Sequence, residues 1–188
     1  MDLRTQKTEK AIINSFIKLR AKKPLNKITV TELSKDAMIS KATFYLHYED
    51  IYDLSEKLQN RLVADIINNI PNPEYIITDP GEYSKILFEA FTANTALTDI
   101  LFPESEKNLL ADRIETHIKS EFYKMRPEFL NSTETDIALS MLIHGAFHAF
   151  RNHMRNNSKE SIEYIGKISK LLADTLFKEI QKGIRKPE

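Results

Sequence analysis

The sequence predicts an all-α protein, and three observations lead to that prediction. Apolar residues recur at the helical spacing of three and four positions, and no segment shows the strict alternation typical of strands. Seven prolines and only four glycines punctuate the 188 residues, and the prolines fall where the helical patterns stop. Finally, several of these patterns begin just after a threonine, serine or aspartate, the residue types that cap helix N-termini.

Two cap signals lie close together near the N-terminus. Thr29 precedes a helix predicted over residues 30–37, and Glu32 has the spacing that completes a capping box. Ser40 precedes a second short helix, predicted over residues 41–47. Two short helices joined by so tight a turn are typical of a helix-turn-helix. A first helix at about 5–22, with an apolar stripe on one face, would complete a three-helix head.

The rest of the chain predicts a helical body. Asp50 is expected to cap a helix over about 51–69, which is too long for the head alone and would connect it to the body. Residues 71–81, rich in proline, are interpreted as a linker. Further helices are expected at about 82–94, 96–101, 104–125, 133–155 and 159–183. The predicted domains are therefore the head at 1–50 and the body at 51–188, with 51–70 as the connecting helix.

Charge and composition restrict the classes of function that this chain can have. The chain has no net charge, but residues 1–48 hold ten Lys and Arg against four Asp and Glu, so one end is basic and the rest acidic. The absence of cysteine excludes disulfides and thiolate metal sites. No apolar run reaches the roughly 18 residues of a membrane span, and the N-terminus lacks a signal core. We therefore expect a cytoplasmic protein with no membrane partner.

The second helix of the predicted pair carries small, hydroxylated and basic residues on its outer positions. A short helix of this kind fits the DNA major groove, and its hydroxyl and ring groups can bond phosphates. Phe44 supplies the apolar side and is assigned to the core. The residues expected to contact double-stranded DNA are Thr29, Thr31, Lys41, Ala42, Thr43, Tyr45, His47 and Tyr48.

Three stretches of this region resemble the DNA-binding domain of the tetracycline-repressor (TetR) family. They are Thr29-Val-Thr-Glu-Leu-Ser34, Ile39-Ser-Lys-Ala-Thr-Phe-Tyr-Leu-His-Tyr48 and Glu49-Asp-Ile-Tyr-Asp-Leu54. The resemblance covers about residues 5–65 and implies a homodimeric transcription regulator. Met38 stands where the family usually has glycine, which would cost about 1 kcal/mol in a left-handed turn. Ile51 stands where the family often has a phosphate-binding lysine.

A histidine-rich run lies in the predicted body. His144 and His148 have the i, i+4 spacing that chelates zinc, but Gly145 stands where the metalloprotease pattern needs glutamate. We therefore predict no metal, no cofactor and no enzymatic activity, and interpret these histidines as lining a pocket or as satisfied core groups. Aromatic enrichment in the body equally suits an effector cavity or a plain core. The residues proposed for the cavity are Phe88, Phe91, Phe122, His144, Phe147 and His148.

The last two predicted helices suggest a dimer. Small residues of the first permit close approach, and the second carries an apolar stripe, as in a four-helix bundle formed by two copies. Packing within one chain is the alternative interpretation. The residues predicted at the dimer interface are Gly145, Ala149, Ile165, Ile168, Leu172 and Leu176.

Together these observations predict a sequence-specific transcription regulator. We expect a homodimeric repressor that binds a palindromic operator and responds to an unidentified small-molecule effector in the body, although the sequence leaves activation open. Two alternatives remain. One is a metal-dependent hydrolase that uses His144 and His148. The other is a co-regulator that keeps the fold but binds protein instead of DNA.

Overall fold

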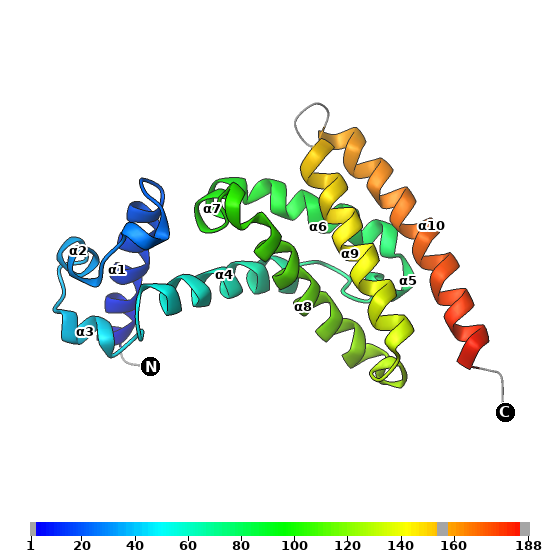
Figure 1. Cartoon of the computed structure of the whole chain (residues 1–188), viewed down its shortest axis with the longest axis horizontal. Helices are drawn as coiled ribbons and strands as arrows, with labels where there is room; N and C mark the ends of the chain where they lie inside the picture. The colour runs from blue at the N-terminus through cyan, green and yellow to red at the C-terminus, as the bar shows by residue number, and fades with distance from the viewer. Residues whose placement is uncertain (1–2, 154–157, 185–188) are drawn as a thin grey trace. The chain divides into compact units, whose positions relative to one another are not determined.

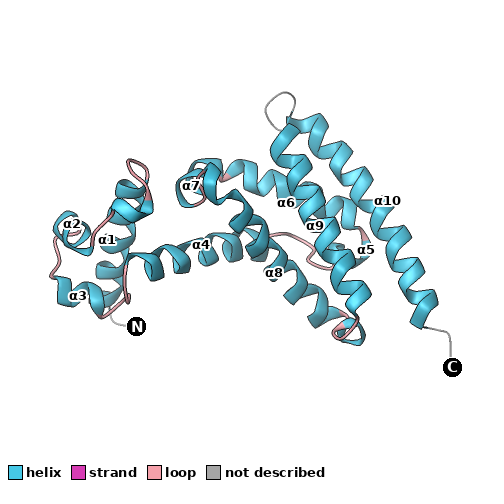
Figure 2. Ribbon diagram, in the orientation of Figure 1, coloured by secondary structure: helices cyan, strands magenta, loops and turns pink. Residues whose placement is uncertain are grey.

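The computed structural model describes residues 3–153 and 158–184, and all regular elements within these ranges are helices (Figures 1 and 2). The predicted all-α class is therefore confirmed. None of the described helices combines the length and apolarity that crossing a bilayer requires. The helices bury their apolar faces, as the periodicity predicted.

The chain divides into two compact units. The first comprises Met1–Leu62 with Ala96–Glu104, and the second comprises Val63–Thr95 with Ser105–Glu188. The boundary falls inside the helix predicted as a connector, whose early residues Leu54 and Leu58 are buried. The functional division after residue 50 stays a prediction.

The first unit is built around a small apolar core. Ile12, Phe16, Leu33, Phe44 and Leu54 are fully buried there. Its helices are α1 (Leu3–Arg20), α2 (Val30–Asp36), α3 (Lys41–Tyr45), the first part of α4 (Ile51–Asn68) and most of α7 (Thr95–Leu101), with a 3-10 turn at Leu25–Lys27. The core assigned to α1 and the inward position of Phe44 both agree with the sequence pattern.

The predicted helix caps are present. Thr29 Oγ1 accepts the Glu32 amide at 3.2 Å and Ser40 Oγ accepts the Thr43 amide at 3.0 Å. At α4, Asp50 Oδ1 accepts the Asp53 amide at 2.8 Å. The Glu32 carboxylate pairs with Lys23, a partner that the capping-box pattern did not predict. Local chemistry therefore sets where these helices begin.

The predicted linker at 71–81 is wrong. It contains α5 (Tyr75–Thr78), whose Ile76 is buried, and it ends in the first turn of α6 (Pro80–Ala93). Pro80, one of the three prolines that suggested a linker, occupies the first position of α6, where a missing amide hydrogen costs nothing. Asp79 caps this helix by accepting the Glu82 amide at 3.3 Å.

Four long helices form most of the second unit. They are α6, α8 (Lys107–Met125), α9 (Thr133–His153) and α10 (Ser158–Ile184). Helix α10 packs against both α6 and α9, and α9 packs in turn against α8 (Figure 1). Two 3-10 turns, Glu104–Glu106 and Pro127–Phe129, flank α8. The start of α8 predicted at 104 was therefore three residues early.

Helices α6 and α10 cross closely where each has a glycine. A Cβ atom built on Gly81 would lie 2.6 Å from the Gly166 carbonyl oxygen, and one on Gly166 would lie 2.9 Å from that of Gly81. Contacts this short between a side chain and backbone force the helices apart. The glycine pair therefore sets the spacing of α6 and α10.

We predict that Gly81→Ala destabilises the protein by about 1–3 kcal/mol, because the added methyl group overpacks the crossing. The free energy of unfolding is measured in urea at low, matched protein concentration. The control is Gly145→Ala on α9, where a built Cβ meets nothing within 4 Å of its own chain and alanine adds helix propensity. Because Gly145 is also predicted at the dimer interface, the variants are compared at a concentration where sedimentation shows monomers. Equal stability of Gly81→Ala and the wild-type protein would contradict the close crossing.

Candidate functional site

The turn between α2 and α3 contains a residue in the left-handed conformation. Met38 has φ of 55° and its side chain is 92% exposed. The Ile39 amide donates to the Ser34 carbonyl at 2.9 Å, and the Met38 amide donates to the Lys35 carbonyl at 3.3 Å. These two bonds form a Schellman motif, which usually places glycine where Met38 stands. The turn therefore has the left-handed geometry that glycine usually adopts, and the Cβ atom of Met38 makes that geometry sterically unfavourable.

Helix α3 presents most of the residues predicted to contact DNA. Lys41, Ala42 and Tyr45 are exposed on it, and Tyr45 is 56% exposed although its ring packs edge-on against Phe44. Thr43 is half-buried, and its hydroxyl lies 2.8 Å from Ser40 Oγ. The polar side of this helix is thus free to meet a partner, while Phe44 anchors the other side.

The remaining predicted contacts lie outside α3 and differ in exposure. Thr29 and Thr31 are exposed at the start of α2, and His47 is half-buried. Tyr48, in contrast, is only 6% exposed and packs against Phe44 at 5.8 Å between ring centroids. Burial raises the pKa of the Tyr48 phenol to about 12, and Glu9 adds to the effect. Tyr48 is therefore mainly a core residue, which disfavours the predicted phosphate contact.

Part of the basic excess of this region is neutralised internally. Lys18 pairs with Asp36 at 2.5 Å, and Lys23 pairs with Glu32. The pair holds the pKa of Asp36 below its usual value, mainly through the hydrogen bond from Lys18. Exposed lysines remain on α1, α2 and α3, namely Lys7, Lys10, Lys35 and Lys41. These side chains are available to a polyanion.

The second unit contains an apolar cavity of about 70 Å³. This is well above the roughly 10–15 Å³ that one water needs. Two predicted residues, Phe88 and Phe147, line it, together with Ile114, Ile118 and Leu142. Its polar lining includes Tyr83, Ser84 and Ser169. The sequence analysis did not identify these hydroxyl residues, because no local pattern relates Tyr83 and Ser84 of α6 to Ser169 of α10.

Four of the residues predicted for the cavity lie elsewhere. Phe91 is buried in the core, and Phe122 stacks on Phe177 at 5.4 Å between ring centroids. His144 Nε2 lies 2.8 Å from Glu115 Oε2 on α8, and His148 is exposed with Nε2 2.8 Å from the Asn152 amide nitrogen. The cavity lies against a different face of α9, so neither histidine lines it as predicted.

The predicted dimer surface separates into two groups. Ile165 is only 7% exposed within its own chain, so it belongs to the intrachain core on the face that α10 turns to its neighbours. Ile168 and Leu172 are 55% and 46% exposed. Leu176 and Ala149 are half-buried, and Gly145 is exposed. Large apolar side chains beyond the prediction are also exposed on α9 and α10: Ile137, Met141, Tyr164 and Leu171.

Comparison with known proteins leaves the family open. No protein-family model matches this sequence, and no curated protein matches it either.

We predict that Met38→Gly raises the free energy of unfolding by about 0.5–1 kcal/mol. Glycine removes the strain of the left-handed conformation, offset in part by the freedom it gives the unfolded chain. Chemical denaturation measures the change. Met38→Ala is the matched control, because it removes the exposed side chain but keeps the Cβ atom. An equal gain in both variants would mean that backbone strain is not the cause.

Proposed function

We propose that this chain is a transcription regulator of the TetR type, which binds double-stranded DNA through α3 and acts as a homodimeric repressor. The observation that carries the proposal is α3 itself. It follows a Schellman turn, is held by Phe44, and leaves Lys41, Ala42 and Tyr45 exposed. A short helix with small and hydrogen-bonding residues on its free side suits the major groove.

Electrostatics support a nucleic acid as the partner. The exposed lysines of α1, α2 and α3 lie in the unit that also contains the free side of α3. Phosphate contacts from such residues position a protein on DNA, whereas contacts from the helix to base edges read the sequence. We therefore propose that Lys41 and Tyr45 of α3 contact the DNA directly, while the other exposed lysines contact phosphates.

The proposed effector is a small, uncharged and mainly apolar molecule that binds the cavity of the second unit. The cavity is lined largely by carbon, and burial raises the pKa of its Tyr83 phenol, which keeps that group neutral. A charged ligand would find no compensating charge among the residues that line it. Tyr83, Ser84 and Ser169 offer hydroxyl groups for orientation.

The proposed dimer uses the exposed apolar side chains of α9 and α10. Several large apolar side chains exposed on two packed helices are typical of an interaction site. A second copy of the same surface, related by a twofold axis, is the simplest partner, and it would present two α3 helices to two half-sites. The residues proposed at its centre are Met141, Gly145, Ile168, Leu171 and Leu172.

We predict that Lys41→Ala and Tyr45→Ala each weaken DNA binding by about 1–3 kcal/mol if they read a base edge, and by less if they contact a phosphate. The probe is a fragment that the purified protein retains from genomic DNA of its own source. Affinity is measured by fluorescence anisotropy at 50 and 200 mM salt, and should fall steeply between them as counterions are released.

The control for these variants is Lys124→Ala, an exposed lysine of the second unit paired with Glu121. It should leave both affinity and salt dependence unchanged. Wild-type affinity in the two α3 variants, or a flat salt response, would overturn the proposed role of α3. Failure to retain any DNA would favour the protein-binding co-regulator.

We predict that the double variant Ile168→Glu, Leu172→Glu is a folded monomer that no longer binds DNA tightly. Both side chains are exposed, so the charges interrupt the dimer surface without entering the intrachain core. Sedimentation measures the mass and circular dichroism the helix content. Lys159→Glu, which changes the net charge by the same amount at an exposed position of α10, should remain dimeric. A dimeric double variant would exclude this surface as the interface.

A further inference from the structure

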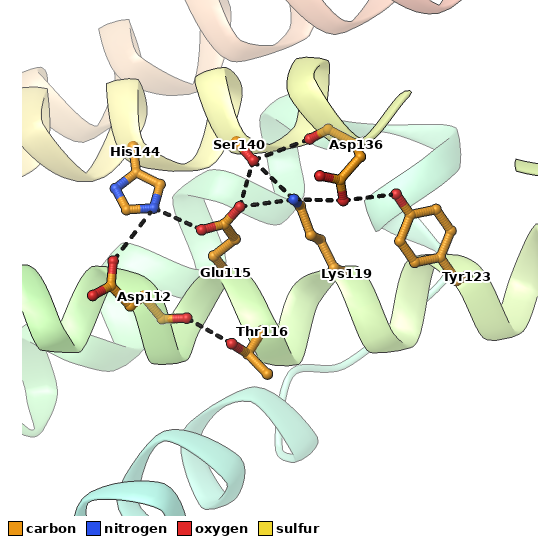
Figure 3. Close-up of polar contacts among 8 residues, drawn as sticks. All are labelled: Asp112, Glu115, Thr116, Lys119, Tyr123, Asp136, Ser140 and His144. Atoms are coloured by element: carbon orange, nitrogen blue, oxygen red, sulfur yellow. Dashed lines mark hydrogen bonds and ion pairs between the residues drawn. The ribbon is translucent and has the colours of Figure 1, made fainter. Parts of the chain in front are cut away.

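Three potential metal ligands meet between α8 and α9, away from α3. Asp112 and Glu115 lie one helical turn apart on α8, and His144 faces them from α9 (Figure 3). His144 Nε2 is 2.8 Å from Glu115 Oε2 and 3.8 Å from Asp112 Oδ1, and the three donor atoms all lie within 4.8 Å of one another. Two helices therefore direct one nitrogen and two carboxylates toward a common point.

The spacing of these atoms fits a shared cation. A metal bound at about 2.0–2.2 Å from nitrogen and oxygen donors keeps neighbouring donors roughly 2.8–3.6 Å apart. The His144–Glu115 separation of 2.8 Å lies at the lower end of that range, and the His144–Asp112 separation of 3.8 Å lies just above it. The longer one exceeds hydrogen-bonding distance, so Asp112 approaches the imidazole without bonding to it. Small side-chain adjustments suffice to form a three-ligand site.

Other residues orient Glu115 for this role. Its Oε1 accepts hydrogen bonds from Lys119 Nζ at 2.8 Å and from Ser140 Oγ at 2.5 Å, which turns Oε2 toward His144 (Figure 3). Lys119 also pairs with Asp136 at 2.7 Å. Supporting bonds of this kind fix the direction of metal-binding carboxylates.

The charge of the cluster also favours a cation. Glu115 accepts hydrogen bonds from Lys119 and Ser140, and Lys119 is shared with Asp136. Among the residues drawn in Figure 3, the three carboxylates of Asp112, Glu115 and Asp136 outnumber the one ammonium group, that of Lys119, so this cluster has a negative excess even with His144 neutral.

The donor set indicates the class of metal. An imidazole ligand disfavours Mg²⁺ and Ca²⁺, which prefer oxygen donors alone. The chain has no cysteine, so soft thiolate chemistry is excluded. We propose that Asp112, Glu115 and His144 form a binding site for a divalent first-row transition metal such as Zn²⁺, with Asp112 exposed as the entry side. The site differs from the i, i+4 histidine pair considered from the sequence, because His148 turns to Asn152.

The site joins two helices that also line the apolar cavity. Ile114 and Ile118 of α8, and Leu142 and Ile143 of α9, reach the cavity from other faces of the same helices. A bound metal would connect α8 to α9 and resist their separation. This inference is independent of DNA binding, so the two can succeed or fail separately.

Isothermal titration of the full-length, chelator-treated protein with Zn²⁺ tests the proposal. One ion should bind per chain and raise the melting temperature, because a ligand of the folded state stabilises it. Asp112→Asn and His144→Gln should each lower the affinity by about tenfold or more, since each removes a direct ligand. Asp112 is exposed, so its variant should fold even if the His144 variant does not.

The matched control is His148→Gln, one turn further along α9 and exposed. It should bind Zn²⁺ like the wild-type protein. Substituting Co²⁺ should produce visible absorption bands that Asp112→Asn loses and His148→Gln retains. Absence of binding, or affinity that is unchanged in Asp112→Asn, would overturn the site. Loss of affinity in His148→Gln would do the same by assigning the ion to other surface histidines.

Discussion

The position of α3 depends on one backbone constraint, the left-handed conformation of Met38. A helix of only five residues is not stable alone, because nucleation fixes several dihedral angles for few hydrogen bonds. It persists here because the Schellman turn ends α2, the Ser40 hydroxyl accepts the Thr43 amide, and Phe44 enters the core. With Phe44 inward, the helical period places Lys41 and Tyr45 on the free side. The strain at Met38 is thus tied to the presentation of the candidate interface.

In the second unit, α10 has two apolar faces with different partners. One contains Ile162, Ile165 and Ala173, which are buried against the neighbouring helices, and the glycine crossing with α6 lies on it. The other contains Ile168 and Leu172, which remain exposed. A helix with apolar residues on more than one side fits a buried position better than a surface position. The apolar stripe predicted from the sequence therefore combined a residue of the intrachain core, Ile165, with exposed residues, Ile168 and Leu172.

Local chemistry made the start of each N-terminal helix predictable. The caps at Thr29, Ser40 and Asp50 depend on residues within three positions, and all three were located from the sequence. Features that depend on distant residues were not. The partner of His144 is Glu115, which is 29 positions away, and no local pattern relates them.

Burial is the other property that local patterns described poorly. The burial of Tyr48 comes from its packing in the first unit, although His47 before it is half-buried and Glu49 after it is exposed. Likewise, Ile76 is buried within a proline-rich segment that looked like a linker, because its partners come from elsewhere in the second unit. Side-chain type and spacing therefore predicted the helices better than they predicted which surfaces stay free.

Helices α8 and α9 join the polar cluster to the cavity through their own rigidity. Ile114 and Ile118 face the cavity, whereas Glu115 and Lys119, their immediate neighbours in sequence, bond to α9. Since a helix moves as a body, a cavity ligand that displaced α8 from α9 would also stretch the bonds from Glu115 to His144 and from Lys119 to Ser140. Stretching these bonds would reduce the net free energy of ligand binding. The polar cluster therefore increases the free energy needed to separate α8 from α9, so that only cavity ligands with enough binding free energy could do so. A cation held by Asp112, Glu115 and His144 would increase that free energy further.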